Sequence, residues 1–168
     1  MKTITIITLL NIIWSSSCFS QTIKGTYAIA NVETGIYLRI KDADTQNGTS
    51  IVAYSPVNWK CVTWDFKQVD NNAYQLTNLY SGKTFQPANL TPVAGSQLEE
   101  QPVNANQETQ QYEFLSAGNA QYLIRLKGTD LYITPADNKG RINAPVKLAN
   151  KIPGNLQHWT LKAQHPDM

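Results

Sequence analysis

The chain has few of the residues on which catalysis and metal binding usually depend. Its 168 residues include only two cysteines and two histidines. His158 and His165 have no acidic or nucleophilic partner at a motif spacing, and neither has a partner at metal-ligand spacing. A pairing of Cys61 with either histidine has no sequence support. These absences argue against an enzyme and give no sign of a cofactor or a metal site.

Charged residues are also scarce, and their signs nearly cancel. Lys and Arg together number 14 and Asp and Glu 12, which gives a formal net charge of +2. Nucleic acids and anionic membrane surfaces attract proteins with a marked basic excess, so the composition predicts neither partner. The neighbouring acids Glu99 and Glu100 are interpreted as solvated strand charges rather than as an acid/base pair.

Long apolar runs are absent except at the amino terminus. Residues 4–14 form an apolar run after the basic Lys2, and small residues follow up to Ser20. This pattern predicts a secretory signal peptide, residues 1–20, with cleavage before Gln21 and a secreted or periplasmic product. A transmembrane helix needs about 20 apolar residues, so the run predicts no membrane span. A cell-surface lipoprotein anchored through Cys18 is the less favoured alternative, because Ser15 stands where lipidated cysteines usually have Leu. A buried amino-terminal strand is a further alternative.

Cleavage would leave Cys61 as the one cysteine of the remaining chain, residues 21–168. An exported chain with one cysteine has no internal disulfide, so its stability must come from a hydrophobic core. We interpret Cys61 as a small apolar residue at the start of a strand. The length suits one domain.

What the sequence does contain is a threefold repeat. Three closing aromatic residues, Trp64, Tyr112 and Trp159, lie 48 and 47 residues apart. The blocks align on their opening tyrosines, Tyr27, Tyr74 and Tyr122. One turn position and two apolar positions then match in every block: Gly35, Gly82 and Asp130; Leu38, Phe85 and Ile133; Ile51, Leu98 and Val146. A period of this length indicates copies of one supersecondary unit, and we place the repeats at about 25–70, 71–117 and 118–164. A residue with positive φ is expected at the turn position, including Asp130 in the third copy.

Within each block the apolar residues alternate as they do in strands. Tyr27-Ala28-Ile29 and Trp64-Asp65-Phe66 place their outer residues on one face, and no stretch after the apolar run keeps a helical period. We therefore predict four short strands per block and twelve in all. One block cannot bury both its apolar faces, so the copies must share a core around a common axis.

The end of each block carries a Gln-x-Trp signature in different states of preservation. Gln157-His158-Trp159 is complete, Gln110-Gln111-Tyr112 exchanges the aromatic, and Val62-Thr63-Trp64 lacks the glutamine. Together with the opening motif Tyr-x-Ile/Leu-x-Asn-x-x-Thr/Ser-Gly, these blocks resemble the ricin-type lectin domain over essentially all of residues 25–162. The resemblance implies an all-β fold, a pseudo-threefold β-trefoil of three four-stranded repeats, and carbohydrate binding.

The sugar-contacting positions of that family are poorly kept here. The resemblance implies an Asp after the second strand, an aromatic after the third and an Asn before the signature glutamine. In the three repeats these positions hold Arg39, Gln86 and Thr134; Tyr54, Gln101 and Ala149; and Cys61, Thr109 and Leu156. Only Tyr54 fits, so the usual galactose-type recognition is not predicted.

The first repeat is the best candidate for a glycan site. Tyr54 would supply a stacking ring and Trp59, which matches no repeated core position, a second one; the neighbouring Asn58, Asp42 and Asp44 would supply polar groups. The alternative is that Trp59 packs on the barrel and the acids are ordinary turn residues.

The predicted function is a secreted, non-catalytic, lectin-like module that binds a glycan or polysaccharide through degenerate sites. The main alternative is a β-trefoil that has lost sugar binding and binds a protein, such as a protease, through segment 87–97. An accessory fragment of an esterase or glycosidase is a third possibility. The sequence does not indicate an oligomeric state.

Overall fold

The computed structural model describes residues 22–89 and 91–167, and the predicted signal peptide and its cleavage site lie outside these ranges. Twelve strands run through the described residues, as predicted, with three short 3-10 turns between them: β1 (Thr26–Asn31), β2 (Tyr37–Ile40), η1 (Lys41–Ala43), β3 (Ile51–Tyr54), η2 (Lys60–Val62), β4 (Thr63–Asp70), β5 (Ala73–Asn78), β6 (Thr84–Pro87), β7 (Leu98–Gln101), η3 (Glu108–Gln110), β8 (Gln111–Ser116), β9 (Gln121–Leu126), β10 (Tyr132–Pro135), β11 (Val146–Ala149) and β12 (His158–Ala163). No helix in the described ranges has the length and hydrophobicity needed to cross a bilayer.

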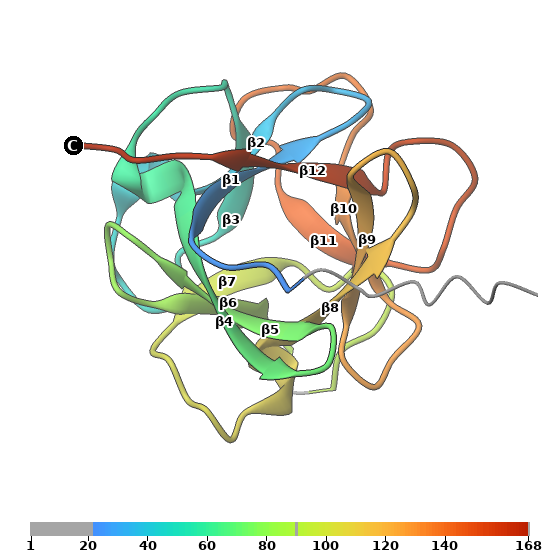
Figure 1. Ribbon diagram of the computed structural model, residues 1–168, viewed down its shortest axis with the longest axis horizontal. Coiled ribbons are helices and arrows are strands. Elements are labelled where there is room, and N and C mark those ends of the chain that lie inside the picture. Colours follow the sequence, from blue (N-terminus) through green and yellow to red (C-terminus); the bar gives the residue numbers. More distant parts are fainter. Residues whose placement is uncertain (1–21, 90, 168) are drawn as a thin grey trace, which may run out of the picture.

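The first and fourth strands of each repeat close into one barrel. Antiparallel pairing runs β1–β4–β5–β8–β9–β12 and returns to β1. The second and third strands form three hairpins, β2–β3, β6–β7 and β10–β11. Isolated bridges join these hairpins to one another at Ser50–Glu99, Val52–Pro145 and Gln97–Lys147. Figure 1 shows the three repeats arranged around the centre of the molecule. Closure removes the barrel's edge strands, and the hairpins cover one end of the shared core.

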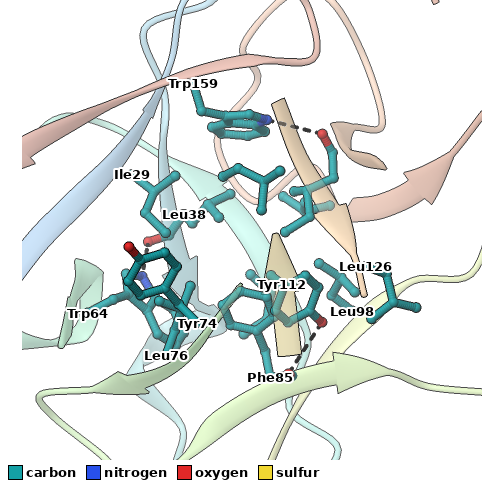
Figure 2. Close-up of a cluster of buried hydrophobic side chains, with 14 of the residues drawn as sticks. Ile29, Leu38, Trp64, Tyr74, Leu76, Phe85, Leu98, Tyr112, Leu126 and Trp159 are labelled. Atoms are coloured by element: carbon teal, nitrogen blue, oxygen red, sulfur yellow. Dashed lines mark hydrogen bonds between the residues drawn. The ribbon is translucent and has the colours of Figure 1, made fainter. Parts of the chain in front are cut away.

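The closing aromatics sit at equivalent places in that core. Trp64, Tyr112 and Trp159 are each fully buried. Figure 2 shows the same hydrogen bond in all three repeats, from the ring to a backbone carbonyl of the repeat's own second strand: Trp64 Nε1 to Leu38 at 3.3 Å, Tyr112 Oη to Phe85 at 3.3 Å and Trp159 Nε1 to Ile133 at 3.1 Å. Tyr replaces Trp in the second repeat because its hydroxyl reaches the same carbonyl.

The strand positions two residues after the opening tyrosines are equivalent as well. Ile29, Leu76 and Ile124 all have zero exposed surface. The predicted threefold equivalence of core positions is therefore confirmed. At the other end of the barrel, Ile23 is buried and its amide donates to Tyr74 Oη at 3.0 Å, so the chain crosses the opening there (Figure 1).

The expected turn geometry holds in two repeats and is wrong in the third. Gly35 and Gly82 have φ of 72° and 69°, but Asp130 does not have positive φ; Gly128, two residues earlier, has a φ of 74°. In the first two repeats the glycine amide bonds the carbonyl of the last residue of the preceding strand, whereas in the third the amide of Thr129 bonds Leu126 at 3.2 Å. The third turn is thus one residue tighter, and its left-handed residue shifts to Gly128.

The asparagine of the opening motif anchors the preceding repeat. Asn78 Nδ2 donates to the carbonyls of Cys61 and Thr63 at 3.2 and 3.3 Å, and Asn78 Oδ1 accepts from the amide of Tyr80 at 3.0 Å. One buried side chain therefore fixes both the turn before β4 and the first loop of the second repeat. These two segments form the walls of the site described next.

Candidate functional site

A hollow of about 330 Å³ lies at the junction of the first repeat and the start of the second. Strand β2, turn η1, the segment before β4 and the loop after β5 each contribute to it. Six residues line it: Arg39, Ala43, Trp59, Lys60, Cys61 and Tyr80. Two of these are cations and two are exposed aromatics, and no carboxylate is among them.

Two aromatic rings meet at this site. The rings of Tyr54 and Trp59 are 6.1 Å apart between centroids with planes inclined by 36°. Trp59 remains 37% exposed because its backbone is extended just before η2, where its carbonyl accepts a hydrogen bond from Thr63 Oγ1 at 2.8 Å. An indole held in this way offers one open apolar face to a ligand.

Arg39 occupies the position where the family resemblance implied an acid. Its guanidinium carbon lies 4.0 Å from the centre of the Tyr54 ring, a cation–π contact. The residue is only 9% exposed, and its Nε is buried without a hydrogen-bond partner among the described residues. A cation of this kind is costly unless a partner of opposite charge joins it.

The second repeat has an equivalent hollow of about 300 Å³ with different chemistry. Gln86 and Gln101 take the places of Arg39 and Tyr54, as the hairpin registers confirm. Gln110, the signature glutamine, closes a network there: its Nε2 donates to Gln86 Oε1 and the Pro102 carbonyl, each at 3.0 Å, and its Oε1 accepts from the Asn104 amide at 2.8 Å and from Gln75 Nε2 at 3.0 Å.

The third repeat uses its signature glutamine in the same way. Gln157 Nε2 donates to Thr134 Oγ1 and to the Asn150 carbonyl, both at 2.9 Å, and Gln157 Oε1 accepts from the Ile152 amide at 3.0 Å. In the first repeat Val62 stands in place of this glutamine and is fully buried. Loss of the glutamine therefore leaves Arg39 without the polar neighbour that its counterparts have.

The predicted site residues are only partly brought together. Of the five, Trp59 alone lines the hollow; Tyr54 contacts the Trp59 ring without lining the hollow itself, and Asp42, Asp44 and Asn58 are exposed elsewhere. Both acids lie on an exposed turn: Asp42 has a left-handed φ of 54° within η1, and Asp44 Oδ1 accepts a hydrogen bond from the amide of Gln46 at 3.0 Å.

Five of the six lining residues were not predicted as site residues, and three of these carry a charge or an aromatic ring. Arg39 stands where the resemblance implies an acid, and its charge and position are visible in the alignment. Lys60 directly follows the predicted Trp59. Tyr80, 51% exposed, belongs to the next repeat, and no signal within the first block could have indicated it. Cys61 is buried with a free thiol, in agreement with its interpretation as an apolar residue.

One of the two neighbouring acids interpreted as solvated is in fact buried. Glu100 has no exposed surface; it accepts a hydrogen bond from Ser81 Oγ, and its Oε2 has no partner among the described residues. Burial raises the pKa of this carboxyl, an effect that Ser81 and the nearby Lys83 oppose. The interpretation fails because the hairpin β6–β7 pairs Glu100 with Phe85, and the backbone of Glu100 bonds Gly48 and Thr49 of the first repeat.

Segment 87–97, the predicted protein-binding loop, connects β6 and β7. Its residue 90 lies outside the described ranges. Val93 is 56% exposed, its amide bonds Ser96 Oγ at 3.0 Å, and the Gly95 amide bonds the Leu148 carbonyl at 2.8 Å. The segment is therefore tied to the third repeat at its carboxyl end.

Known proteins share both the sequence pattern and the fold. Residues 11–86 and 60–149 match the ricin-type beta-trefoil lectin domain-like family. The chain belongs to this family. No curated protein matches it in sequence. Within the described ranges, no group of three or more His, Cys, Asp or Glu residues could hold a metal ion.

Solved structures with the same fold cover this trefoil lectin domain almost completely. A designed threefold symmetric protein, ThreeFoil, aligns with a TM-score of 0.77 at 20% identity, over 82% of this chain and 97% of its own. The Rhizoctonia solani agglutinin aligns with a TM-score of 0.76 at 18% identity, over 86% and 98%. The Macrolepiota procera ricin B-like lectin, solved with lactose, aligns with a TM-score of 0.70 at 23% identity, over 86% and 99%. The predicted β-trefoil is confirmed.

Proposed function

We propose that this protein is a secreted, non-catalytic carbohydrate-binding module whose working site is the hollow of the first repeat. The observation that carries the proposal is the open Trp59 ring beside Tyr54, at the hairpin end where the family resemblance implies an aromatic sugar platform. Aromatic faces bind the apolar side of a sugar ring, and nearby polar groups orient its hydroxyls. The other two repeats have Gln101 and Ala149 in place of Tyr54, so they are degenerate sites.

The affinity of this site should be modest. One shallow hollow with one exposed platform provides few fixed contacts, so we expect a dissociation constant on the order of 1 mM, about 4 kcal/mol of binding free energy. Physiological binding would then depend on a polysaccharide with many copies of the epitope or on self-association of the lectin.

A glycan array tests the proposal. The secreted protein, displayed multivalently to compensate for weak single-site affinity, should bind a restricted set of glycans, and Trp59→Ala should abolish that signal. Gln101→Ala, at the position equivalent to Tyr54 in the second repeat, is the matched control and should leave the signal unchanged. A blank array together with inhibition of a protease would replace the proposal with the protein-binding alternative through segment 87–97.

Export is a separate part of the proposal and rests on the amino-terminal apolar run. Mass spectrometry of the protein recovered from the medium or periplasm should give a chain that starts at Gln21 and carries one free thiol. A diacylglycerol adduct on Cys18 would show a membrane-anchored lipoprotein instead.

A further inference from the structure

We infer that the hollow of the first repeat is selective for carboxylated sugars: the carboxylate of a uronic acid or related sugar acid pairs with Arg39 while the sugar ring lies against Trp59. This inference rests on the proposed function and specifies the ligand class of the same site. It is carried by the guanidinium of Arg39, whose buried Nε has no hydrogen-bond partner among the described residues, beside the exposed indole of Trp59.

The guanidinium of Arg39 is the central observation. Its Nε is buried without a hydrogen-bond partner among the described residues, and no ion pair joins the guanidinium to a described acid. The other two arginines of the chain are paired: Arg125 Nε lies 2.6 Å from Glu113 Oε2, and Arg141 Nε lies 2.8 Å from Asp137 Oδ2. Arg39 is more deeply buried than either partnered arginine, so the arginine with the largest need for a counter-charge is the one that lacks it.

The charge of the surroundings favours an anion. Lys60 lines the same hollow, and no acid does. The closest acids in sequence, Asp42 and Asp44, are exposed on η1 and its end rather than in the hollow. A carboxylate that entered would therefore meet two cations without a competing acid.

The geometry suits a carboxylate better than a neutral hydroxyl. Tyr54 covers one face of the guanidinium at 4.0 Å, so a ligand must approach the other face or the edge that carries the N–H groups. That edge matches the two oxygens of a planar carboxylate and gives paired hydrogen bonds. The Trp59 ring, 6.1 Å from Tyr54, then lies where the sugar ring attached to this carboxylate can stack.

Matched saccharides test the inference. Oligosaccharides of galacturonic and glucuronic acid, their methyl esters and the corresponding galactose and glucose oligosaccharides would be titrated against the secreted protein by NMR. We expect the acid forms to bind about ten- to a hundredfold more tightly than the esters and neutral forms, the effect of one charge-assisted interaction. Equal binding of acid and neutral forms would overturn the inference and leave the carbohydrate function intact. Binding of none of them, with a blank glycan array, would remove both. Tighter binding of a sulfated galactose oligosaccharide would overturn the carboxylate assignment.

Variants of Arg39 provide the second arm. Arg39→Gln should remove the preference for the acid form. Arg39→Lys keeps the positive charge but not the planar pair of N–H donors, so it should retain part of that preference. Arg141→Gln, which changes an exposed arginine, is the matched control and should keep the full preference. If folded Arg39→Gln still preferred the acid form, the assignment to Arg39 would be overturned. If that variant does not fold, the comparison of acids with methyl esters on the unmodified protein still decides the ligand class.

Discussion

The hollow of the first repeat is lined by two exposed aromatic rings and by Arg39, whose Nε has no hydrogen-bond partner among the described residues. The equivalent hollow of the second repeat contains amides that bond one another. The difference follows from two positions. Where the second repeat has Gln86 and Gln110, hydrogen-bonded at 3.0 Å, the first has Arg39 and Val62. In the second repeat the signature glutamine bonds the polar groups of its hollow; in the first, where Val62 replaces it, Arg39 Nε has no partner among the described residues. The repeat that lacks the signature glutamine is thus the one whose hollow is lined by exposed aromatic rings.

The barrel core differs from the hollows because all three repeats still share it. Trp159→Ala should therefore give the largest effect of any change considered, a loss of about 3 to 5 kcal/mol in the free energy of unfolding, since it opens a cavity and orphans the Ile133 carbonyl. Urea unfolding would measure it. Trp59→Ala is the matched control and should change stability by less than about 0.5 kcal/mol, because that ring is a surface group. Equal losses would mean that Trp59 is a packing residue and not a platform.

The amide network of the second repeat can be removed by giving that repeat the residue found in the first. Gln110→Val gives the second repeat the first repeat's residue. We expect it to cost about 2 kcal/mol, because Gln110 is buried and its removal leaves Gln75 Nε2, Gln86 Oε1 and the Asn104 amide without that partner. Chemical denaturation compared with Gln101→Ala, a more exposed amide of the same hollow, measures the difference. A cost no greater than that of Gln101→Ala would show that the network is not what distinguishes the two hollows.

The contact between the first two repeats should respond to pH through Glu100. Its pKa is raised in the folded protein, chiefly by burial, so the folded state holds this proton more tightly than the unfolded chain. The stability that Glu100 contributes is therefore complete below the ordinary pKa of about 4.5 and is lost as the pH rises through the raised value.

Glu100→Gln, which is neutral at every pH, isolates that effect. We expect the variant to be more stable than the parent by about 1 kcal/mol at pH 7 and equal to it at pH 4. Thermal melting at both values would measure the difference, with Glu99→Gln as the control on the neighbouring position. A larger gain at pH 4 than at pH 7 would contradict the assigned direction of the pKa shift.

Sequence reasoning reached the fold because the fold depends on spacing. Trp64 and Trp159 occupy the same position in the first and third repeats, and each makes the same hydrogen bond. The alignment of the repeats is therefore enough to locate the core. The conformation of the third turn was not predicted correctly, because its left-handed residue is Gly128 rather than Asp130. Alignment on Asp130 conceals this change of turn length.

The site could be predicted only in part because its walls come from different segments. Tyr54 and Trp59 are near in sequence and near in space, and their pairing was predicted. Asp42 lies close in sequence but is exposed on η1 with a left-handed φ, a local backbone feature that composition does not reveal. Tyr80 enters from the next repeat through the hydrogen bonds of Asn78, a contact that requires the assembled barrel.

Binding by paired variants tests most directly whether the first repeat is the working site. A glycan selected on the array would be titrated into the parent protein, into Tyr54→Ala/Trp59→Ala and into Gln101→Ala. The account predicts that the double variant loses at least about tenfold in affinity while remaining folded, and that Gln101→Ala binds as the parent does. Unchanged affinity in the double variant, or a loss confined to Gln101→Ala, would contradict it and place the site in another repeat.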